Sequence, residues 1–464
     1  MQHTATLRVR PRIRSSALIW PFIAFNALAM SVASAQVVDP GIRGEGGPGG
    51  TGLPGMNGTE SQLFFQSFAS FAGNLSSFSD GFGPRFNGAS CTQCHTHPSL
   101  GGTSPPSSNP QVTTVDSLAG IGGRNVLPSF IQHGGPIREA RFKRYNNGTP
   151  DGSVHQLFVI SGVVTGDEDA SRCNIVQPDF EAELARDNVS LRIVTPVFGA
   201  GLIEQIGETT ILNNLAANAA RKAALGISGR VNRGPNDNGI GRFGWKAQNV
   251  SLQVFSAEAF AVEMGISNKM FPNERDETPE CQFLSMPNIK QTPDSESGRL
   301  ASDVTDGATL FMKFVAPPVP HPTIPGGADS IARGRAAFET VGCAACHTPK
   351  LPTRAVTDYP VFANRDVNLF SDLGLHNMGP GLADDIVQGV AKGDEFRTAP
   401  LWGLGVRAFF LHDGRTSNMI EAILSHRSAG NRNYGPSEAN ATIDNYSALP
   451  VTRQQDLVNF LRSL

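Results

Sequence analysis

The feature that most constrains the fold is a five-residue motif that occurs twice: two cysteines three positions apart, followed directly by a histidine. The defining residues of the two copies are Cys91, Cys94 and His95, and Cys343, Cys346 and His347. This spacing is the attachment signature of a c-type haem. Each thiol bonds to one vinyl group of the porphyrin, and the imidazole of the histidine is aimed at the iron. The sequence therefore predicts two covalently bound haem c groups, with both histidines as iron ligands.

Zinc knuckles and redox dithiols also use pairs of cysteines at this spacing. Neither kind of site requires a histidine directly after the second cysteine, and here a histidine follows in both copies. The motif therefore favours haem over zinc or a dithiol.

A helix is predicted before the second motif, because Ile331, Phe338 and Val341 fall on one helical stripe. The chain also ends on a predicted helix, Thr452–Leu464, with apolar residues at positions i, i+3, i+4 and i+7. A cytochrome c domain begins with a helix before its motif and closes with a C-terminal helix. We therefore expect residues 329–464 to form one haem domain.

A comparable helix is predicted before the first motif. Phe64, Phe68 and Phe71 lie on one face of it, and Thr59 with Gln62 has the pattern of a capping box. This helix is the N-terminal counterpart of the helix that precedes the second motif.

The region after the first motif has a different character. Residues 154–164 and 191–197 are rich in β-branched residues that alternate with polar ones, which indicates strands. Residues 195–201 also resemble residues 399–405, a weak internal repeat that relates the two halves. The fold class is thus predicted to be mainly α, with two cytochrome c-like haem domains. A large insertion with a few β-strands elaborates the N-terminal domain.

The first 35 residues have the pattern of a secretory signal peptide. Four arginines precede an apolar stretch over residues 17–30, and Ala33–Ala35 form a cleavage triplet. The apolar stretch contains Pro21 and is short for a membrane span, which favours a cleaved signal peptide over the alternative of an uncleaved anchor. We expect a periplasmic protein, cleaved near Ala35, whose mature form has no membrane span.

Composition suggests where the segments meet. A glycine-rich stretch precedes the first helix, and a run of prolines followed by glycines separates the halves. The predicted segments are a signal peptide (1–35), a Gly/Pro-rich flexible leader (36–58), an N-terminal haem domain with insertions (59–316), a linker (317–328) and a C-terminal cytochrome c-like haem domain (329–464).

Charge and the remaining cysteines add two expectations. Without residues 1–35 the formal charge changes from −3 to −7, because four arginines and no acids are removed. This balance argues against nucleic-acid binding and is compatible with a basic electron donor, a small cytochrome or cupredoxin. Cys173 and Cys281 remain as an even pair, for which we expect a disulfide, with two separate buried thiols as the alternative.

Several longer strings resemble a known family. Residues 83–95, 241–247, 375–382 and 396–405 are similar to the bacterial dihaem c-type oxidoreductases, also described as thiol-oxidoreductase-like or peroxidase-like proteins. This family is more distantly similar to the dihaem cytochrome c peroxidases. The resemblance covers about residues 59–464 and implies an oxidoreductase with two haems.

The resemblance implies an axial ligand for the C-terminal haem. In the peroxidases a His-Asp-Gly loop is followed fourteen residues later by the distal ligand, usually methionine. Here His412 begins that loop, and His426 stands at the ligand position. Met419, Ile423 and His426 share one helical face, which favours a ligand over a solvated histidine at a helix C-terminus. With two histidines, this iron would have no open position and would pass electrons.

The resemblance places the reaction at the N-terminal haem. The peroxidases have a glutamine and, ten residues later, a glutamate and methionine in the peroxide pocket, which Gln253, Glu263 and Met264 match. Ten residues leave two helical side chains about 80° apart. Glu263 would take the first proton of peroxide and return it to the leaving oxygen. The alternative is that Gln253 and Glu263 are ordinary exposed residues. For the sixth iron position, His133 is a candidate, and His155 is expected to be structural.

Two tryptophans are candidates for the contact between the haems. Trp245 and Trp402 lie in strings that carry the resemblance, although aromatic residues near haem edges usually serve packing. His376 and Met378 are alternative ligands of the C-terminal iron, ranked below His426.

The sequence thus predicts a periplasmic dihaem enzyme that reduces hydrogen peroxide or another small oxidant with electrons from a donor protein. Two alternatives remain open. The first is an electron-transfer cytochrome without enzymatic activity, and the second is a haem oxidase or oxygenase acting on an organic or protein substrate. A thiol oxidoreductase is not supported, because only Cys173 and Cys281 lie outside the motifs and nothing near them activates a thiolate.

Overall fold

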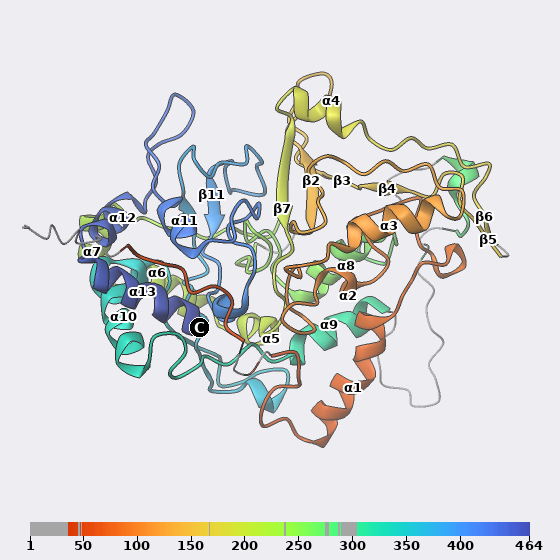
Figure 1. Cartoon of the computed structure of the whole chain (residues 1–464). Coiled ribbons are helices and arrows are strands. Elements are labelled where there is room, and N and C mark those ends of the chain that lie inside the picture. Colours follow the sequence, from red (N-terminus) through yellow and green to blue (C-terminus); the bar gives the residue numbers. More distant parts are fainter. Residues whose placement is uncertain are drawn as a thin grey trace, which may run out of the picture. The chain divides into compact units, whose positions relative to one another are not determined.

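Two helix pairs, each beginning with the helix before one cysteine motif, form the framework of the chain (Figure 1). The computed structural model describes residues 36–464 apart from 45–46, 48, 167, 236–237, 274–277, 286–287 and 289–303. The predicted signal peptide therefore lies outside the described residues.

The α-helices are α1 Gly58–Ala72, α2 Cys91–Cys94, α3 Pro110–Ala119, α4 Phe180–Ala185, α5 Ala200–Glu204, α6 Glu208–Ala216, α7 Ala219–Leu225, α8 Leu252–Glu263, α9 Val304–Phe314, α10 Ala328–Val341, α11 Met419–Leu424, α12 Asn440–Ser447 and α13 Val451–Ser463. Short 3-10 helices are η1 Phe78–Asp80, η2 Pro279–Cys281, η3 Cys343–Ala345, η4 Pro360–Phe362 and η5 Leu404–Val406. The strands are β1 Arg85–Phe86, β2 Arg138–Phe142, β3 Val154–His155, β4 Phe158–Val159, β5 Val164–Thr165, β6 Glu168–Asp169, β7 Val189–Ile193, β8 Leu351–Pro352, β9 Asp366–Val367, β10 Leu375–Asn377 and β11 Glu395–Arg397.

In the N-terminal half, α1 packs on α9, and the two helices lie side by side in Figure 1. The Phe71 ring stacks on Phe311 with the centroids 4.3 Å apart, and Phe64 stacks on the same ring at 5.4 Å. Phe64 and Phe71 are buried as predicted, whereas Phe68 stays exposed. Helical geometry explains the difference, since Phe68 is about 60° from Phe71 but Phe64 is about 20° from it.

The start of α1 corrects one prediction. Asn57 is the N-cap, because its Oδ1 accepts from Glu60 N at 2.9 Å while Glu60 Oε2 accepts from Asn57 N at 2.7 Å. This reciprocal pair is a capping box two residues before the one predicted with Thr59 and Gln62. The other oxygen of Glu60 accepts from Val361 N at 2.9 Å, a contact with the C-terminal half that the local pattern does not reveal.

In the C-terminal half, α10 packs on α13 (Figure 1). The helix α13 begins one residue before its predicted start, and its predicted stripe is buried. Phe338 meets Phe460 edge-on, with the ring centroids 5.4 Å apart. Gly334 allows the close approach, because a Cβ atom there would lie 2.0 Å from the carbonyl oxygen of Asp456.

The strands of the predicted insertion form small antiparallel sheets. The largest has the order β3-β2-β7, with Arg138 opposite Ile193 and Phe142 opposite Val189. The prediction of strands within residues 154–164 and 191–197 is confirmed, whereas the central strand β2 was not predicted.

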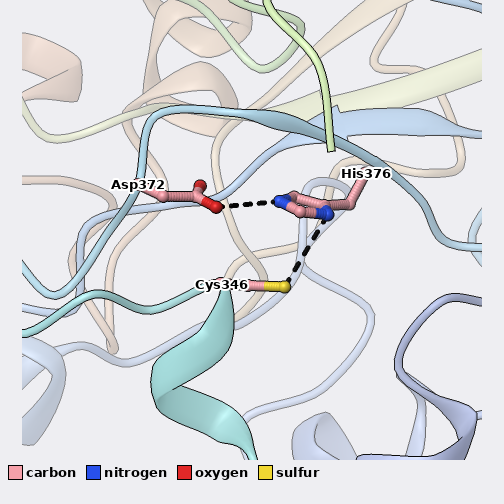
Figure 2. Close-up of side chains that lie close together, drawn as sticks. All are labelled: Cys346, Asp372 and His376. Atoms are coloured by element: carbon pink, nitrogen blue, oxygen red, sulfur yellow. Dashed lines mark hydrogen bonds and ion pairs between the residues drawn. The ribbon is translucent and has the colours of Figure 1, made fainter. Parts of the chain in front are cut away.

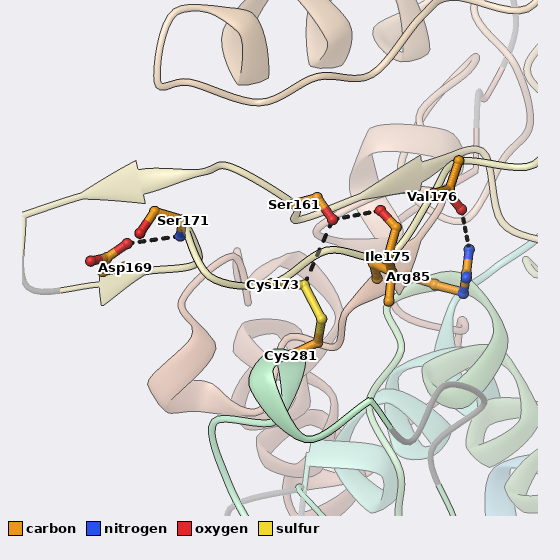
Figure 3. Close-up of a disulfide and its surroundings, with 8 residues drawn as sticks. All are labelled: Arg85, Ser161, Asp169, Ser171, Cys173, Ile175, Val176 and Cys281. Atoms are coloured by element: carbon orange, nitrogen blue, oxygen red, sulfur yellow. Dashed lines mark hydrogen bonds between the residues drawn. A yellow bond between two sulfur atoms is a disulfide. The ribbon is translucent and has the colours of Figure 1, made fainter.

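A disulfide joins Cys173 to Cys281, which confirms the predicted pairing (Figure 3). Close to this bond, Ser161 Oγ donates to Ile175 O at 2.6 Å. The bond connects the loop after β6 with η2, 108 positions further along the chain.

Buried ion pairs connect segments that are distant in the sequence, and residues 37–464 form one compact unit. Asp384 accepts from Arg192 Nη2 at 2.6 Å and lies 3.0 Å from Lys246 Nζ. Asp39 pairs with Arg462 of α13 at 2.7 Å, so part of the expected flexible leader is fixed in place. Over the described residues, no helix has the length and apolar character needed to cross a bilayer.

Candidate functional site

The first cysteine motif borders a cavity of about 170 Å³ that is partly open to solvent, here called the N-terminal cavity. Cys91 and Cys94 are the ends of the short helix α2, and His95 follows it directly. All three residues line the cavity, and one face of α8 forms another part of its wall.

His95 presents one ring nitrogen to this cavity. Its Nδ1 lies 3.1 Å from Gly102 O and donates to it, which leaves Nε2 available to a metal. Burial lowers the pKa of His95 to about 4, so the ring is in the neutral form that binds metals. Among the described residues that line this cavity, His95 is the one histidine.

Glu263 is the last residue of α8 and lines the same cavity. Its Oε2 accepts from Asn87 Nδ2 at 2.8 Å, and its backbone oxygen accepts from Asn87 N at 2.6 Å. Burial and then repulsion from Glu139 raise the pKa of Glu263 to about 8, against the lowering by Asn87 and Arg141. A carboxyl group that titrates near neutral pH is suited to exchange protons with a ligand.

The structure does not bring Gln253 into the N-terminal cavity. Its side chain is exposed, and Nε2 donates to Asp306 Oδ1 at 3.1 Å. At about 100° per residue, Gln253 is about 120° from Ala259, which is in the middle of the face that lines the cavity. The ten-residue spacing placed Gln253 about 80° from Glu263, but it did not show which face of α8 lines the cavity.

The other histidines of the N-terminal half also lie outside this cavity. His133, the predicted candidate for the sixth iron position, is exposed. His155 stacks on Phe142 with the centroids 3.8 Å apart and pairs with Asp151 at 2.7 Å, which fits a structural residue. His97 Nε2 lies 2.7 Å from a backbone carbonyl. Met264, which follows Glu263, does line the cavity.

The second motif borders a cavity of about 220 Å³, here called the C-terminal cavity. Cys343, Cys346 and His347 line it, and so does His426. The structure therefore brings the predicted axial pair to one cavity, although the two histidines are 79 positions apart in the sequence.

Both histidines of this pair are oriented by backbone carbonyls. His347 Nδ1 lies 3.0 Å from Phe370 O, and His426 Nδ1 lies 2.7 Å from Ala422 O. Each ring therefore keeps Nε2 for a metal. Burial lowers the pKa of both, that of His347 to about 4. His426 lies just after the end of α11, the position expected of a solvated histidine at a helix C-terminus. It also lines the cavity, the position expected of an iron ligand.

His376 also lines the C-terminal cavity, but its ring nitrogens are engaged (Figure 2). They lie 3.0 Å from Asp372 Oδ2 and 2.8 Å from Glu438 Oε2. Burial alone would lower the pKa of His376, yet Cys346 and Asp372 raise it well above its usual value. Cys346, Asp372 and His376 are close enough to hold one metal ion, but a thioether at Cys346 would remove that ligand. The arrangement therefore ranks His376 below His426 as an iron ligand.

Trp245 lies at the junction of the two cavities and lines both. Its Nε1 donates to Ile193 O at 2.9 Å, and its ring meets His412 edge-on with the centroids 6.3 Å apart. Trp402 lines neither large cavity. It borders a smaller cavity of about 30 Å³, which Trp245 also lines.

Two residues of these sites have no role in the predictions from sequence. His412 served only as a landmark, yet it lines the C-terminal cavity, stacks on Phe396 at 4.4 Å and contacts Trp245. Asn87 lies in a string that carries the family resemblance, but only the fold shows that it holds Glu263. The His-Asp-Gly and Phe-Asn-Gly strings are the signals by which both residues could be found.

The residues of each cavity fit a haem better than a zinc ion. Zinc needs thiolates and a full tetrahedral set. Within the described part of the chain, the one cluster of potential metal ligands contains neither Cys91 nor Cys343. A large, mostly apolar cavity with two thiols and a free imidazole nitrogen is the surrounding that a covalent haem requires.

Comparison with known protein families gives a match over most of the chain. The family model described as "Di-haem oxidoreductase, putative peroxidase" matches residues 139–464, a range that begins after the first motif. No curated protein matches the chain.

Two solved structures are similar to parts of the chain. A MauG-like protein associated with microbial copper homeostasis has 15% sequence identity and a TM-score of 0.28, covering 56% of this chain and 89% of that one. Hydrazine synthase from Kuenenia stuttgartiensis has 18% identity and a TM-score of 0.22, covering 35% of this chain. The match spans about half, 55%, of that hydrazine synthase chain.

Proposed function

Because the chain belongs to the di-haem oxidoreductase family, we propose that it is a periplasmic peroxidase with two covalent c-type haems. It reduces one hydrogen peroxide to two waters, using two protons and two electrons. A small cytochrome or cupredoxin supplies the electrons one at a time. They enter at the C-terminal site, and peroxide reacts at the N-terminal site.

The observation that carries this proposal is the difference between the two cavities. His95 is the one histidine among the described residues of the N-terminal cavity, which supports an iron with an open position. The C-terminal cavity contains both His347 and His426, each with Nε2 available, which supports an iron with both axial positions filled. One site is therefore suited to bind a small oxidant and the other to transfer electrons.

The residues of the N-terminal cavity provide proton transfer. A haem held by Cys91, Cys94 and His95 would supply the iron that binds peroxide and the electrons for breaking its O–O bond. Glu263, ionised, takes the proton of the bound oxygen on its carboxylate and returns it to the departing oxygen, which leaves as water. Asn87 fixes this carboxylate through Oε2, and the buried surroundings keep its pKa close to the working pH.

Electron transfer between the sites is assigned to Trp245. Its side chain lines both cavities, and its hydrogen bond to Ile193 holds the indole in one orientation.

The division into haem domains 59–316 and 329–464 is part of the proposal. Its support is that each motif follows the first helix of one packed pair, α1 with α9 and α10 with α13. The disulfide supports export to an oxidising compartment.

The test is the spin state of the protein with one iron reduced. We expect a high-spin signal from the N-terminal haem that disappears when peroxide is added. A His426→Gly variant should show a second high-spin haem, which assigns the two signals. Two low-spin spectra under all conditions would contradict the proposal and favour a pure electron-transfer cytochrome.

A further inference from the structure

The C-terminal cavity contains two arginines that the proposed function does not use. Arg397 and Arg407 are each 8% exposed, and both line this cavity as well as the smaller cavity beside Trp245 and Trp402. A backbone hydrogen bond joins Arg397 to Trp245, with Arg397 N donating to Trp245 O at 2.8 Å. The two guanidinium groups therefore lie next to the junction of the haem sites.

Neither arginine has a carboxylate partner among the described residues. Arg397 Nε donates to Gly244 O at 3.0 Å, and no described side chain forms an ion pair with Arg407. Burial lowers the pKa of both groups to about 10, and repulsion from Arg407 contributes to the lower pKa of Arg397. Two like charges are thus buried in one place without compensation.

Two other buried arginines of the chain are compensated by carboxylates. Arg192 is 2% exposed and is held by Asp384 at 2.6 Å, and Arg462 is 1% exposed and is held by Asp39 at 2.7 Å. An unpaired buried charge is strongly destabilising, so proteins rarely keep one without a partner. The pair at 397 and 407 therefore indicates an anion that belongs to the mature protein.

We propose that Arg397 and Arg407 bind the propionate carboxylates of the C-terminal haem and turn its propionate edge towards the small cavity beside Trp245. This inference rests on the proposed function, because it requires a haem in the C-terminal cavity. A haem carries two propionates, and the planar guanidinium fork matches a carboxylate in shape and charge. Both negative charges are thereby neutralised by two positive ones.

The arginines also affect the electron affinity of this site. An iron with two histidine ligands has a low reduction potential. A nearby positive charge stabilises the reduced form, so each guanidinium raises the potential and keeps the site accessible to electrons from the donor.

The test is the midpoint potential of the C-terminal haem in four variants, Arg397→Met, Arg407→Met, Arg407→Lys and Arg335→Met. We expect the first two to shift the potential downwards and Arg407→Lys to give an intermediate value. Arg335, which is 57% exposed on α10, is the matched control and should leave the potential unchanged. If Arg407→Met does not accumulate as folded protein, Arg407→Gln replaces it with the same expected shift. Potentials in both methionine variants that equal the control would overturn the inference.

A second arm distinguishes propionates from a free anion. The wild-type potential is measured in chloride and in phosphate at equal ionic strength. We expect the same value in both, whereas a dependence on the anion would show that a free anion occupies the pair. The midpoint potential does not depend on peroxide turnover, so it can also be measured in a protein without peroxidase activity. Loss of the C-terminal redox couple altogether would instead show that the proposed function is wrong.

Discussion

Among single residues, Glu263 has the environment that most directly determines the chemistry. Its carboxyl group is buried beside Glu139, which favours the protonated form, while the Asn87 amide donates to Oε2 and favours the ionised form. The balance holds the pKa at about 8, against an ordinary value near 4.5. In the proposed reaction, proton transfer at neutral pH depends on this balance, so changes to either partner have predictable consequences.

Replacing Glu263 with glutamine removes the proton acceptor and keeps the size of the side chain. We expect kcat/KM for peroxide to fall by about 10²–10⁴, the usual contribution of a general acid–base group. Steady-state assays with a reduced electron donor measure the change. Gln253→Ala on the same helix is the control and should retain full activity, because Gln253 faces away from the cavity. Full turnover by Glu263→Gln would exclude Glu263 as the proton carrier.

The pH dependence of the reaction tests the role of Asn87. Because Glu263 acts in its ionised form, kcat/KM should rise with pH and level off above about 8. In Asn87→Ala the hydrogen bond that lowers the pKa of Glu263 is lost, so the rising limb should move to higher pH. If the pKa of Glu263 rises by about one, the ionised fraction at pH 7 falls about tenfold. A limb at the same pH in wild type and variant would show that Asn87 does not act through Glu263.

At the level of helices, the close contact of α10 with α13 depends on Gly334. A methyl group there would meet the carbonyl oxygen of Asp456 at 2.0 Å and Phe460 Cβ at 2.7 Å. The backbone of the partner helix cannot yield unless the two helices separate. The contact explains why this position, in the middle of a helix, carries the residue with the lowest helix propensity apart from proline.

We expect Gly334→Ala to lower the free energy of unfolding by about 1–3 kcal/mol, as overpacking of a tight contact does. Helix propensity acts in the opposite direction by about 1 kcal/mol, so the loss isolates the contact. Gly58→Ala in α1 is the matched control, since no atom lies within 4 Å of the added Cβ, and it should be neutral or stabilising. Urea unfolding followed by circular dichroism measures both. A stabilised Gly334→Ala would disprove the close packing.

The helices show what sequence periodicity reveals and what it misses. The apolar stripe of α13 predicted a helix within one residue at each end, because its repeat extends over more than two turns. The capping box of α1 was misplaced by two residues, because Asn57 and Thr59 both satisfy the local pattern. The structure uses Asn57 and Glu60, and Glu60 also accepts a hydrogen bond from Val361 in the other half of the chain. Gln253 was misplaced because spacing on a helix does not say which face meets the cavity.

For the whole molecule, the two sites depend on contacts between segments that are far apart in the sequence. Asp384 joins Arg192 and Lys246, and Trp245 lines both cavities. The cysteine motifs predicted the two proposed haem sites, because the two cysteines and the histidine of each motif are adjacent in the chain. His412 and the arginines 397 and 407 were not predictable as site residues, because only the fold brings them to the junction.

The disulfide is the longest covalent connection within this arrangement. Cys173 and Cys281 enclose 108 positions, so their bond restricts the unfolded chain strongly. Replacing both with serine should lower the free energy of unfolding by about 2–5 kcal/mol. Thermal unfolding of the double variant measures the loss, and wild-type protein treated with reductant should show the same decrease. A melting temperature unchanged by either treatment would mean that the bond does not stabilise the native fold.

The central claim is that both cavities hold a covalently attached haem. Its most direct test is the mass of the denatured, purified polypeptide, combined with the pyridine haemochrome spectrum. We predict a mass that exceeds that of the mature chain by two haem groups, and half of that excess in a variant with serine at Cys91 and Cys94. A denatured chain at its bare mass, without a haemochrome band, would contradict the account.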